Sequence, residues 1–154
     1  MPDDFIPRGY TSLTPFLCVA GAAAAIDFYT AVFGATLVER MDGPDGAVAH
    51  AELDFDRGRL QLGDPSPAYD TAAPAGGTVT YSIALYCRDV DGVVAAARDG
   101  GATVREEPQD FATGDRFASI VDPFGVRWTV MTRVEDLSAQ ERDRRLSDWA
   151  TQNL

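Results

Sequence analysis

The repeated stretches "GATLVER" at residues 34–40 and "GATVREE" at residues 101–107 decide how the fold of this chain is interpreted. Each stretch begins with Gly-Ala-Thr directly after a segment with helical patterning, and their first glycines, at positions 34 and 101, are 67 residues apart. A short match is weak evidence by itself, but both copies occupy the same helix-to-strand boundary and are followed by further strand-like runs. The sequence therefore predicts an internal duplication of a βαβββ unit.

The first copy combines one helical run with strand-like runs on either side of it. A strand is predicted over 13–19, followed by an alanine-rich helix that ends at Gly34. Within this helix Ile26, Tyr29 and Phe33 follow the spacing of one buried helical face. Three more strands are predicted, within 35–41, 47–55 and 59–64.

The second copy restarts the same order after a segment rich in Pro, Ala and Gly. Strand, helix and three strands are predicted within 79–87, 89–101, 102–107, 115–122 and 126–133. A further helix is expected beyond Thr132, with Ser138 and Glu141 at the spacing of a capping box. The predicted organisation is an arm over 1–12, a first module over 13–64, a linker over 65–78, a second module over 79–133 and a C-terminal helix over 134–154.

Composition and charge narrow the classes of partner. A formal net charge of −11 repels phosphate backbones, so a nucleic acid is not an expected partner. The sequence has no apolar run long enough to span a membrane, and its first residues lack the hydrophobic core of a secretion signal. We therefore expect a cytoplasmic protein with no membrane contact.

Several motifs in order resemble one known family. The stretches "TPFLCVAGAAAAIDFYTAVFGA", "MDGPDGAVAHAEL", "VDGVVAAARDGGATV" and "GDRFASIVDPFGVRW" together resemble the PhnB-like branch of the glyoxalase/bleomycin resistance/dioxygenase superfamily, also called vicinal oxygen chelate proteins. The resemblance covers nearly the whole chain. It implies an α+β fold in which two βαβββ modules form curved mixed sheets around a cavity, commonly in a homodimer, and here with an added C-terminal helix.

The superfamily includes metal-dependent lyases, isomerases and dioxygenases as well as metal-free proteins that sequester antibiotics, so the fold alone does not set the function. Matching by motif puts the positions of the family's metal ligands at Thr14, Gln61, Ser82 and Thr129. None of the four is His, Asp, Glu or Cys, and hydroxyls with one amide make a poor first shell for Zn²⁺, Ni²⁺ or Fe²⁺. No metal ligands and no cofactor are therefore predicted.

Period-2 alternation assigns the side chains of four predicted strands to two faces. The apolar face is expected to pack on the helices and contains Leu13, Leu17, Val19, Leu60, Leu62, Ile83, Leu85, Val126, Trp128 and Val130. The opposite face mixes aromatic rings with hydrogen-bonding groups, as a small-molecule cavity requires. The ligand-binding residues predicted there and at its rim are Thr14, Phe16, Gln61, Ser82, Tyr86, Arg116, Phe117, Arg127, Thr129 and Met131.

Two charged features suggest more specific chemistry. Arg116 or Arg127 could pair with a carboxylate or phosphate of the ligand, because a guanidinium offers a planar fork of donors. His50, the only histidine, shares a strand face with Glu52, and a histidine beside a carboxylate can act as a general base or start a metal site. These two residues are the weak catalytic candidates.

The leading hypothesis is a dimeric, metal-free protein that binds a small molecule, with sequestration of an aromatic or cationic compound as its expected role. The ligand would lie between Phe16, Tyr86, Phe117 and Met131, oriented by Gln61, Ser82 and Thr129. The alternative is a metal-dependent lyase or isomerase, similar to glyoxalase, that uses His50 and Glu52. A third possibility is a subunit with a filled cavity whose C-terminal helix recruits a partner.

Overall fold

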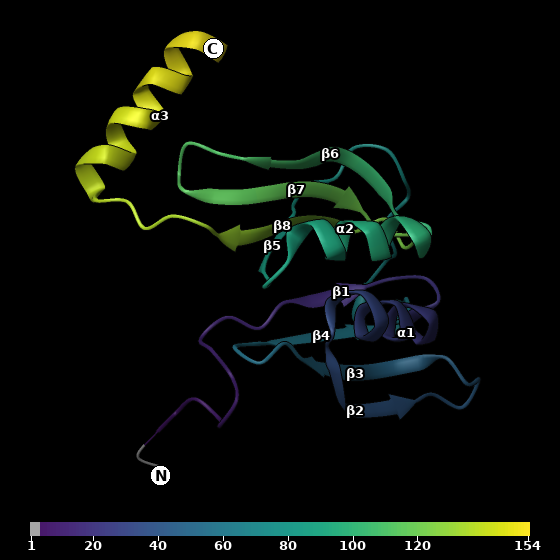
Figure 1. Ribbon diagram of the computed structural model, residues 1–154. Coiled ribbons are helices and arrows are strands. Elements are labelled where there is room, and N and C mark those ends of the chain that lie inside the picture. The colour runs from purple at the N-terminus through teal and green to yellow at the C-terminus, as the bar shows by residue number, and fades with distance from the viewer. Residues whose placement is uncertain (1–3) are drawn as a thin grey trace. The chain divides into compact units, whose positions relative to one another are not determined.

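The computed structural model describes residues 4–154 and contains two compact units (Figure 1). The first unit runs to Val79 and includes Pro123–Gly125, and the second comprises Thr80–Asp122 and Val126–Leu154. The elements of the first unit are β1 (Phe16–Cys18), α1 (Ala22–Phe33), β2 (Thr36–Asp42), β3 (Val48–Asp54), β4 (Arg59–Gly63) and a short 3₁₀ turn, η1 (Pro67–Tyr69). Those of the second unit are β5 (Ile83–Tyr86), α2 (Val90–Asp99), β6 (Thr103–Asp110), β7 (Asp115–Val121), β8 (Arg127–Arg133) and α3 (Ala139–Asn153).

Each unit contains one four-stranded mixed sheet, with strand orders β1-β4-β3-β2 and β5-β8-β7-β6. In both sheets the first strand pairs in parallel with the last, and the remaining pairs are antiparallel. The α+β class, the two βαβββ modules and the added C-terminal helix are thereby confirmed. No helix among residues 4–154 combines the length and the apolar character needed to span a membrane.

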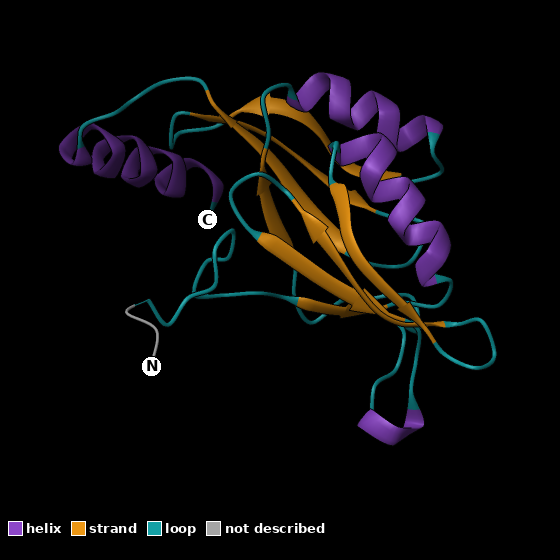
Figure 2. Cartoon of the chain, turned by 90° about the horizontal axis from the view of Figure 1, so that it is seen from below, coloured by secondary structure: helices purple, strands orange, loops and turns teal. Residues whose placement is uncertain are grey.

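One face of each sheet is covered by the helix of the same unit. α1 lies against β2 and β3, and α2 lies against β6, β7 and β8; Figure 2 shows these helices beside the strands. The alternate strand residues on that side form the core, among them Leu17, Leu62, Trp128 and Val130. We call the other side of each sheet its open face.

The start of α1 is held by a residue from the end of the sheet. Gly21, the residue before the helix, has a left-handed φ of 81° and offers no side chain as a cap. The Oδ1 atom of Asp64 instead accepts the backbone N–H groups of Gly21 at 2.9 Å and Ala22 at 3.0 Å, while its Oδ2 accepts that of Val48 at 2.8 Å. One carboxylate thus satisfies helix and strand donors that would otherwise lack partners.

The turn between β7 and β8 is organised by Asp122. Its Oδ1 accepts the backbone N–H of Val126 and its Oδ2 accepts the indole N–H of Trp128, both at 2.9 Å. Gly125 has a φ of 89°, which explains why a glycine ends this turn. Asp122 therefore fixes both the turn and the largest side chain of the core in the second unit.

β1 and β5 begin later than the alternation predicts. The alternation assigns Leu13 to the apolar face, which is wrong: Leu13 precedes β1 and is 82% exposed. β1 starts only after Pro15, which has no N–H to donate to a neighbouring strand. Thr14 and Ser82 likewise lie one or two positions before β1 and β5.

Candidate functional site

On the open face of the first sheet the strand pairing aligns three side chains in one row. Phe16 on β1 pairs with Gln61 on β4, and Gln61 pairs with Glu52 on β3. The Phe16 ring is 45% exposed, whereas Glu52 is 4% exposed. An exposed aromatic ring therefore lies in the same row as a buried carboxylate, with a half-buried amide between them.

The carboxylate of Glu52 is surrounded by three donors. Oε1 accepts from Nη1 of Arg59 at 2.6 Å, and Oε2 accepts from Nε2 of Gln61 at 3.3 Å and from the hydroxyl of Tyr10. The guanidinium of Arg59 also lies 5.1 Å from the centre of the Tyr10 ring and 3.4 Å from Oδ2 of Asp54. We call these five residues the Glu52 cluster.

The charge on Glu52 is stabilised in spite of its burial. Burial is the largest single influence and raises the pKa of this carboxyl, but the hydrogen bonds from Tyr10, Gln61 and Arg59 together outweigh it and leave the pKa below its ordinary value. The hydrogen bond between Tyr10 and Glu52 raises the pKa of the Tyr10 hydroxyl, because the phenol donates to a carboxylate. Glu52 is therefore ionised at neutral pH, and its charge is balanced by that of Arg59.

His50 lies on the same open face but does not join this cluster. Its ring centre is 6.1 Å from that of Phe16, with the planes tilted by 30°. Within residues 4–154 no hydrogen bond links His50 to Glu52. The expected His50–Glu52 pair thus shares a face, as the alternation predicts, without direct contact between the two groups.

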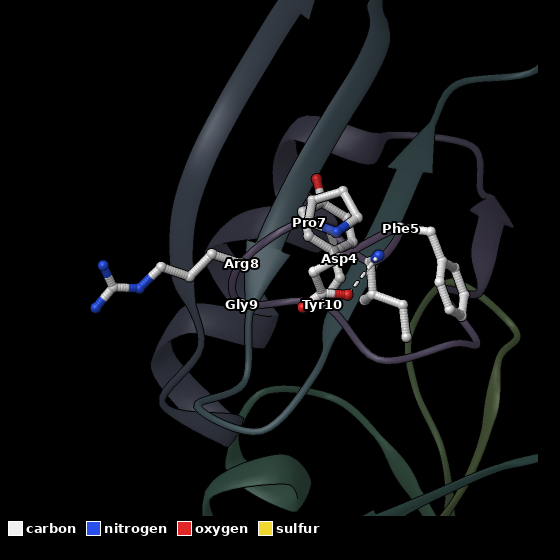
Figure 3. A pocket seen from close by; sticks show the side chains of 7 residues that line it. Asp4, Phe5, Pro7, Arg8, Gly9 and Tyr10 are labelled. Carbon is white, nitrogen blue, oxygen red and sulfur yellow. Dashed lines mark hydrogen bonds between the residues drawn. The ribbon is translucent and has the colours of Figure 1, made fainter. Parts of the chain in front are cut away.

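The N-terminal arm forms a hollow of about 860 Å³, drawn in Figure 3. It is lined by the continuous segment Asp4, Phe5, Ile6, Pro7, Arg8, Gly9 and Tyr10. Of these residues Tyr10 belongs to the Glu52 cluster. Because a single strand-free segment lines the hollow, it lacks the convergent side chains of several elements that a ligand site requires, and we do not assign it one.

On the open face of the second sheet, three of the predicted ligand-binding residues form a row. Tyr86 on β5 pairs with Met131 on β8, which pairs with Phe117 on β7. The Tyr86 side chain is 55% exposed, and Met131 and Phe117 are half-buried. The next row along the strands contains Thr129 and Ser119.

A second buried carboxylate, Asp115, pairs with Arg133 in the row on the other side of Phe117 and Met131. Asp115 accepts from the hydroxyl of Thr113 at 2.8 Å, from Nε of Arg133 at 2.8 Å and, over a longer distance of 3.4 Å, from the hydroxyl of Tyr86. Burial is the largest influence and raises the pKa of Asp115. The hydrogen bonds from Arg133 and Thr113 are the main opposing influences, and the pKa is lower than its ordinary value. Asp115 is therefore also ionised and fully engaged.

The two candidate arginines differ in their surroundings. Arg116 lies on the face that α2 covers: its Nε and Nη2 bind the carboxylate of Asp91 on α2 at 2.7 and 2.8 Å, and its Nη1 binds Asp110 at 3.0 Å. The pKa of Asp91 is lowered chiefly by this bond. Arg127 lies on the open face, where its Nε donates to Oγ of Ser119 at 3.2 Å. Of the two, only Arg127 is oriented toward the predicted ligand side.

The four positions matched to metal ligands do not suit a transition metal. Thr14 and Ser82 precede their strands, and Gln61 and Thr129 lie within theirs. Their donors are hydroxyls and one amide, which bind Zn²⁺ or Fe²⁺ poorly. In the part of the chain that the structure describes, no three His, Cys, Asp or Glu side chains are grouped so as to hold a metal ion. The residues present do not fit the family's metal centre.

Sequence reasoning missed two participants. Tyr10 contacts Glu52 from the N-terminal arm, 42 positions away in the sequence, and no local sequence pattern predicts such a contact. Asp115 begins a strand predicted over 115–122 and does begin β7, but nothing in the sequence marks it as a buried carboxylate. Its position between Thr113 and Arg116 gave no signal that the partner would be Arg133.

Comparison with known proteins gives consistent results. The family model described as glyoxalase/bleomycin resistance protein/dioxygenase superfamily matches residues 11–130. An uncharacterized protein of Mycobacterium bovis, Mb0911c, is 36% identical over 135 aligned residues, and the alignment covers 84% of this chain and 88% of that protein.

Two solved structures show the same fold. TioX from Micromonospora sp. ML1 superposes with a TM-score of 0.64 and 25% identity, covering 80% of this chain and 98% of that one. A PhnB protein from Bacillus cereus has a TM-score of 0.61 and 21% identity, covering 79% and 99% of the two chains. This likeness concerns the fold alone, so the PhnB-like branch is still a prediction.

Proposed function

Because the chain belongs to the glyoxalase/bleomycin resistance protein/dioxygenase superfamily, we propose that it binds a small, partly aromatic molecule on the open faces of its sheets without a metal ion. The observation that carries the proposal is the row formed by Tyr86, Met131 and Phe117, which offers an aromatic and thioether surface next to hydroxyl groups. Exposed apolar groups on one face of a sheet favour association with other molecules, so such a surface is typical of a binding site.

The remaining contacts follow from the same faces. Phe16 would supply a second aromatic surface, with Gln61 beside it as a hydrogen-bonding group. Thr14 beside the first sheet, and Ser82 and Thr129 of the second unit, would each offer a hydroxyl to a ligand on the sheet of their own unit. Arg116 does not enter the proposal, because Asp91 and Asp110 already occupy its donor fork. Sequestration of an aromatic compound is the role we favour; the cationic alternative has only the net charge of −11 in its support.

The test begins with the purified native protein. Its intact mass under non-denaturing conditions and its metal content are measured on one sample, and any retained small molecule is identified. If nothing is retained, an aromatic fragment library screened by ligand-observed NMR provides the probe. We expect Phe16→Ala and Tyr86→Ala to weaken binding by roughly tenfold, as the loss of an aromatic contact of about 1 to 1.5 kcal/mol implies.

A matched control is available in Tyr69→Ala, since Tyr69 is exposed and lies outside both sheets. This variant should bind like the wild type. Equal affinities of the wild type, Phe16→Ala and Tyr86→Ala for every ligand found would contradict the proposal.

The alternative is a metal-dependent lyase or isomerase that uses His50 and Glu52. It is less well supported, because both oxygens of Glu52 already accept hydrogen bonds from Arg59, Gln61 and Tyr10. About one metal ion per subunit in the native protein, lost in a His50→Ala variant, would favour the enzyme. The homodimer and the cytoplasmic location stay predictions, and the same intact-mass measurement reports the oligomeric state.

A further inference from the structure

The two open faces differ in the carboxylates beside their arginines, at positions related by the internal duplication. Strand pairing aligns Phe16, Gln61 and Glu52 in the first sheet and Ala84, Thr129 and Ser119 in the second. Ser119 therefore occupies the position of Glu52, and Thr129 that of Gln61. The arginines correspond as well, because Arg59 pairs with the last residue of β3 and Arg127 with the last residue of β7.

In the first module the arginine has carboxylate partners within the chain, of which Glu52 is the nearer and Asp54 the more distant. Nη1 of Arg59 lies 2.6 Å from Oε1 of Glu52, and the side chains of both residues are mostly buried. The Gln61 amide and the Tyr10 hydroxyl complete the surroundings of the carboxylate. In the first module the side chain of Glu52, from β3, therefore shows where a carboxylate can bind beside the arginine of β4.

In the second module the same arrangement lacks the carboxylate. Arg127 is half-buried and donates to Oγ of Ser119, a residue only 1% exposed. Within residues 4–154 no Asp or Glu forms an ion pair with Arg127. As the acceptor in that bond, the Ser119 hydroxyl retains its own hydrogen, and the Thr129 hydroxyl lies beside it in register.

We propose that Arg127, with Ser119 and Thr129, binds a carboxylate group of the ligand at the position where the first module carries Glu52. This inference rests on the proposed function and specifies one end of the ligand. Thr129, which pairs with Ser119, lies two residues before Met131 on β8, about 7 Å along the strand. Met131 with Tyr86 and Phe117 would therefore contact the aromatic end of a short ligand. A carboxylate is preferred to a phosphate, because a protein of net charge −11 repels a dianion more strongly.

The experiment compares benzoate with the isosteric neutral benzamide and with phenyl phosphate. Binding is followed by NMR, including the signal of the Arg127 Nε–H, and affinities are taken from titrations. Benzoate should bind at least about tenfold more tightly than benzamide, the advantage expected of one charge-assisted hydrogen bond. Arg127→Gln should abolish this advantage, and Arg127→Lys should retain part of it because the charge stays and the fork is lost.

Two further variants sharpen the result. Ser119→Glu copies the first module and should remove the benzoate advantage by giving Arg127 an internal partner. Arg105→Gln removes the same charge at an exposed site of β6 and should leave all affinities unchanged. Thermal unfolding of each variant shows whether it is folded. If Ser119→Glu does not fold, the carboxylate site is tested by Arg127→Gln alone.

Each contrary result has a distinct meaning. Equal binding of benzoate and benzamide, or a benzoate advantage that survives Arg127→Gln, would overturn the inference and leave the proposed function standing. Preference for phenyl phosphate that depends on Arg127 would overturn the choice of carboxylate. If no probe binds, the inference falls, and the proposed function is judged separately by the effect of Phe16→Ala and Tyr86→Ala on the retained ligand.

Discussion

Glu52 shows how a single carboxylate can link distant parts of one module. It is buried, yet it accepts hydrogen bonds from the N-terminal arm through Tyr10 and from β4 through Arg59 and Gln61. Removing Glu52 would leave the buried Arg59 with only the longer contact to Asp54, at 3.4 Å. The Glu52 cluster therefore fastens the arm to the first sheet.

Replacing Glu52 with glutamine should lower the free energy of unfolding at pH 7 by roughly 3 kcal/mol, because Arg59 loses its buried partner. The pKa of Glu52 is depressed in the folded protein, so the stability contributed by its ionised form is present above its ordinary value of 4.5 and is lost as the pH falls through the lower, folded value. The difference in the free energy of unfolding between wild type and Glu52→Gln should therefore decrease below about pH 4.5. Urea unfolding from pH 7 to pH 3 measures it.

The control for this experiment is Glu106→Gln, since Glu106 is exposed on β6 and forms no ion pair within residues 4–154. Its unfolding free energy should follow the wild type across the whole pH range. A constant gap between wild type and Glu52→Gln down to pH 3 would contradict the depressed pKa.

At this scale the sequence predicts faces better than partners. Alternation alone identified Phe16, Gln61 and Thr129 as open-face residues and Leu62, Trp128 and Val130 as core residues, and the strand register and burial agree. It could not predict that Tyr10 binds Glu52, because that contact depends on how the arm folds back over the sheet. Whether the open-face residues bind a ligand is still a prediction.

At the scale of elements, α3 differs from the other two helices. Its N-terminus is capped by Ser138 as predicted, and Arg145 bonds to Glu141 within it and to Glu135 before it. None of its residues is buried, and in Figure 1 it projects away from the second sheet. Its ring contact with that unit is between Trp149 and Phe111, with centroids 5.3 Å apart. The packing of α3 against the rest of its unit is thus slight.

We expect the amides of α3 to exchange with solvent at least about tenfold faster than those of β3 and β7, since a helix of 15 residues with little packing is marginal alone. Hydrogen exchange followed by NMR at low protein concentration measures this. Ser138→Ala should accelerate the exchange of α3 further, because it removes the cap, and should leave the strands unchanged. Protection of α3 equal to that of the strands would instead mean that another surface covers it, and its loss on dilution would identify a second copy.

The duplication could be predicted at the scale of the whole chain because the same short sequence occurs at the same place in both modules. Gly34 and Gly101 mark the same boundary in both modules, and the order of elements that follows is the same in each. The divergence of the two copies at Glu52 and Ser119 could not be interpreted from sequence, since it acquires meaning only when the strand register aligns the two positions. Local patterning therefore predicts the architecture, and three-dimensional register reveals where the modules differ chemically.

The net charge of −11 makes a prediction of its own at this scale. Crowded negative charge destabilises a compact chain by self-repulsion, and salt screens that repulsion more than it weakens the buried Arg59–Glu52 pair. Raising NaCl from about 0.01 M to about 0.5 M at pH 7 should therefore increase the free energy of unfolding by about 1 kcal/mol. Urea unfolding in each buffer measures the change. The same comparison near pH 4.3, where the net charge approaches zero, should show little salt effect. Destabilisation by salt at pH 7 would mean that ion pairs, rather than self-repulsion, dominate the electrostatic energy of the fold.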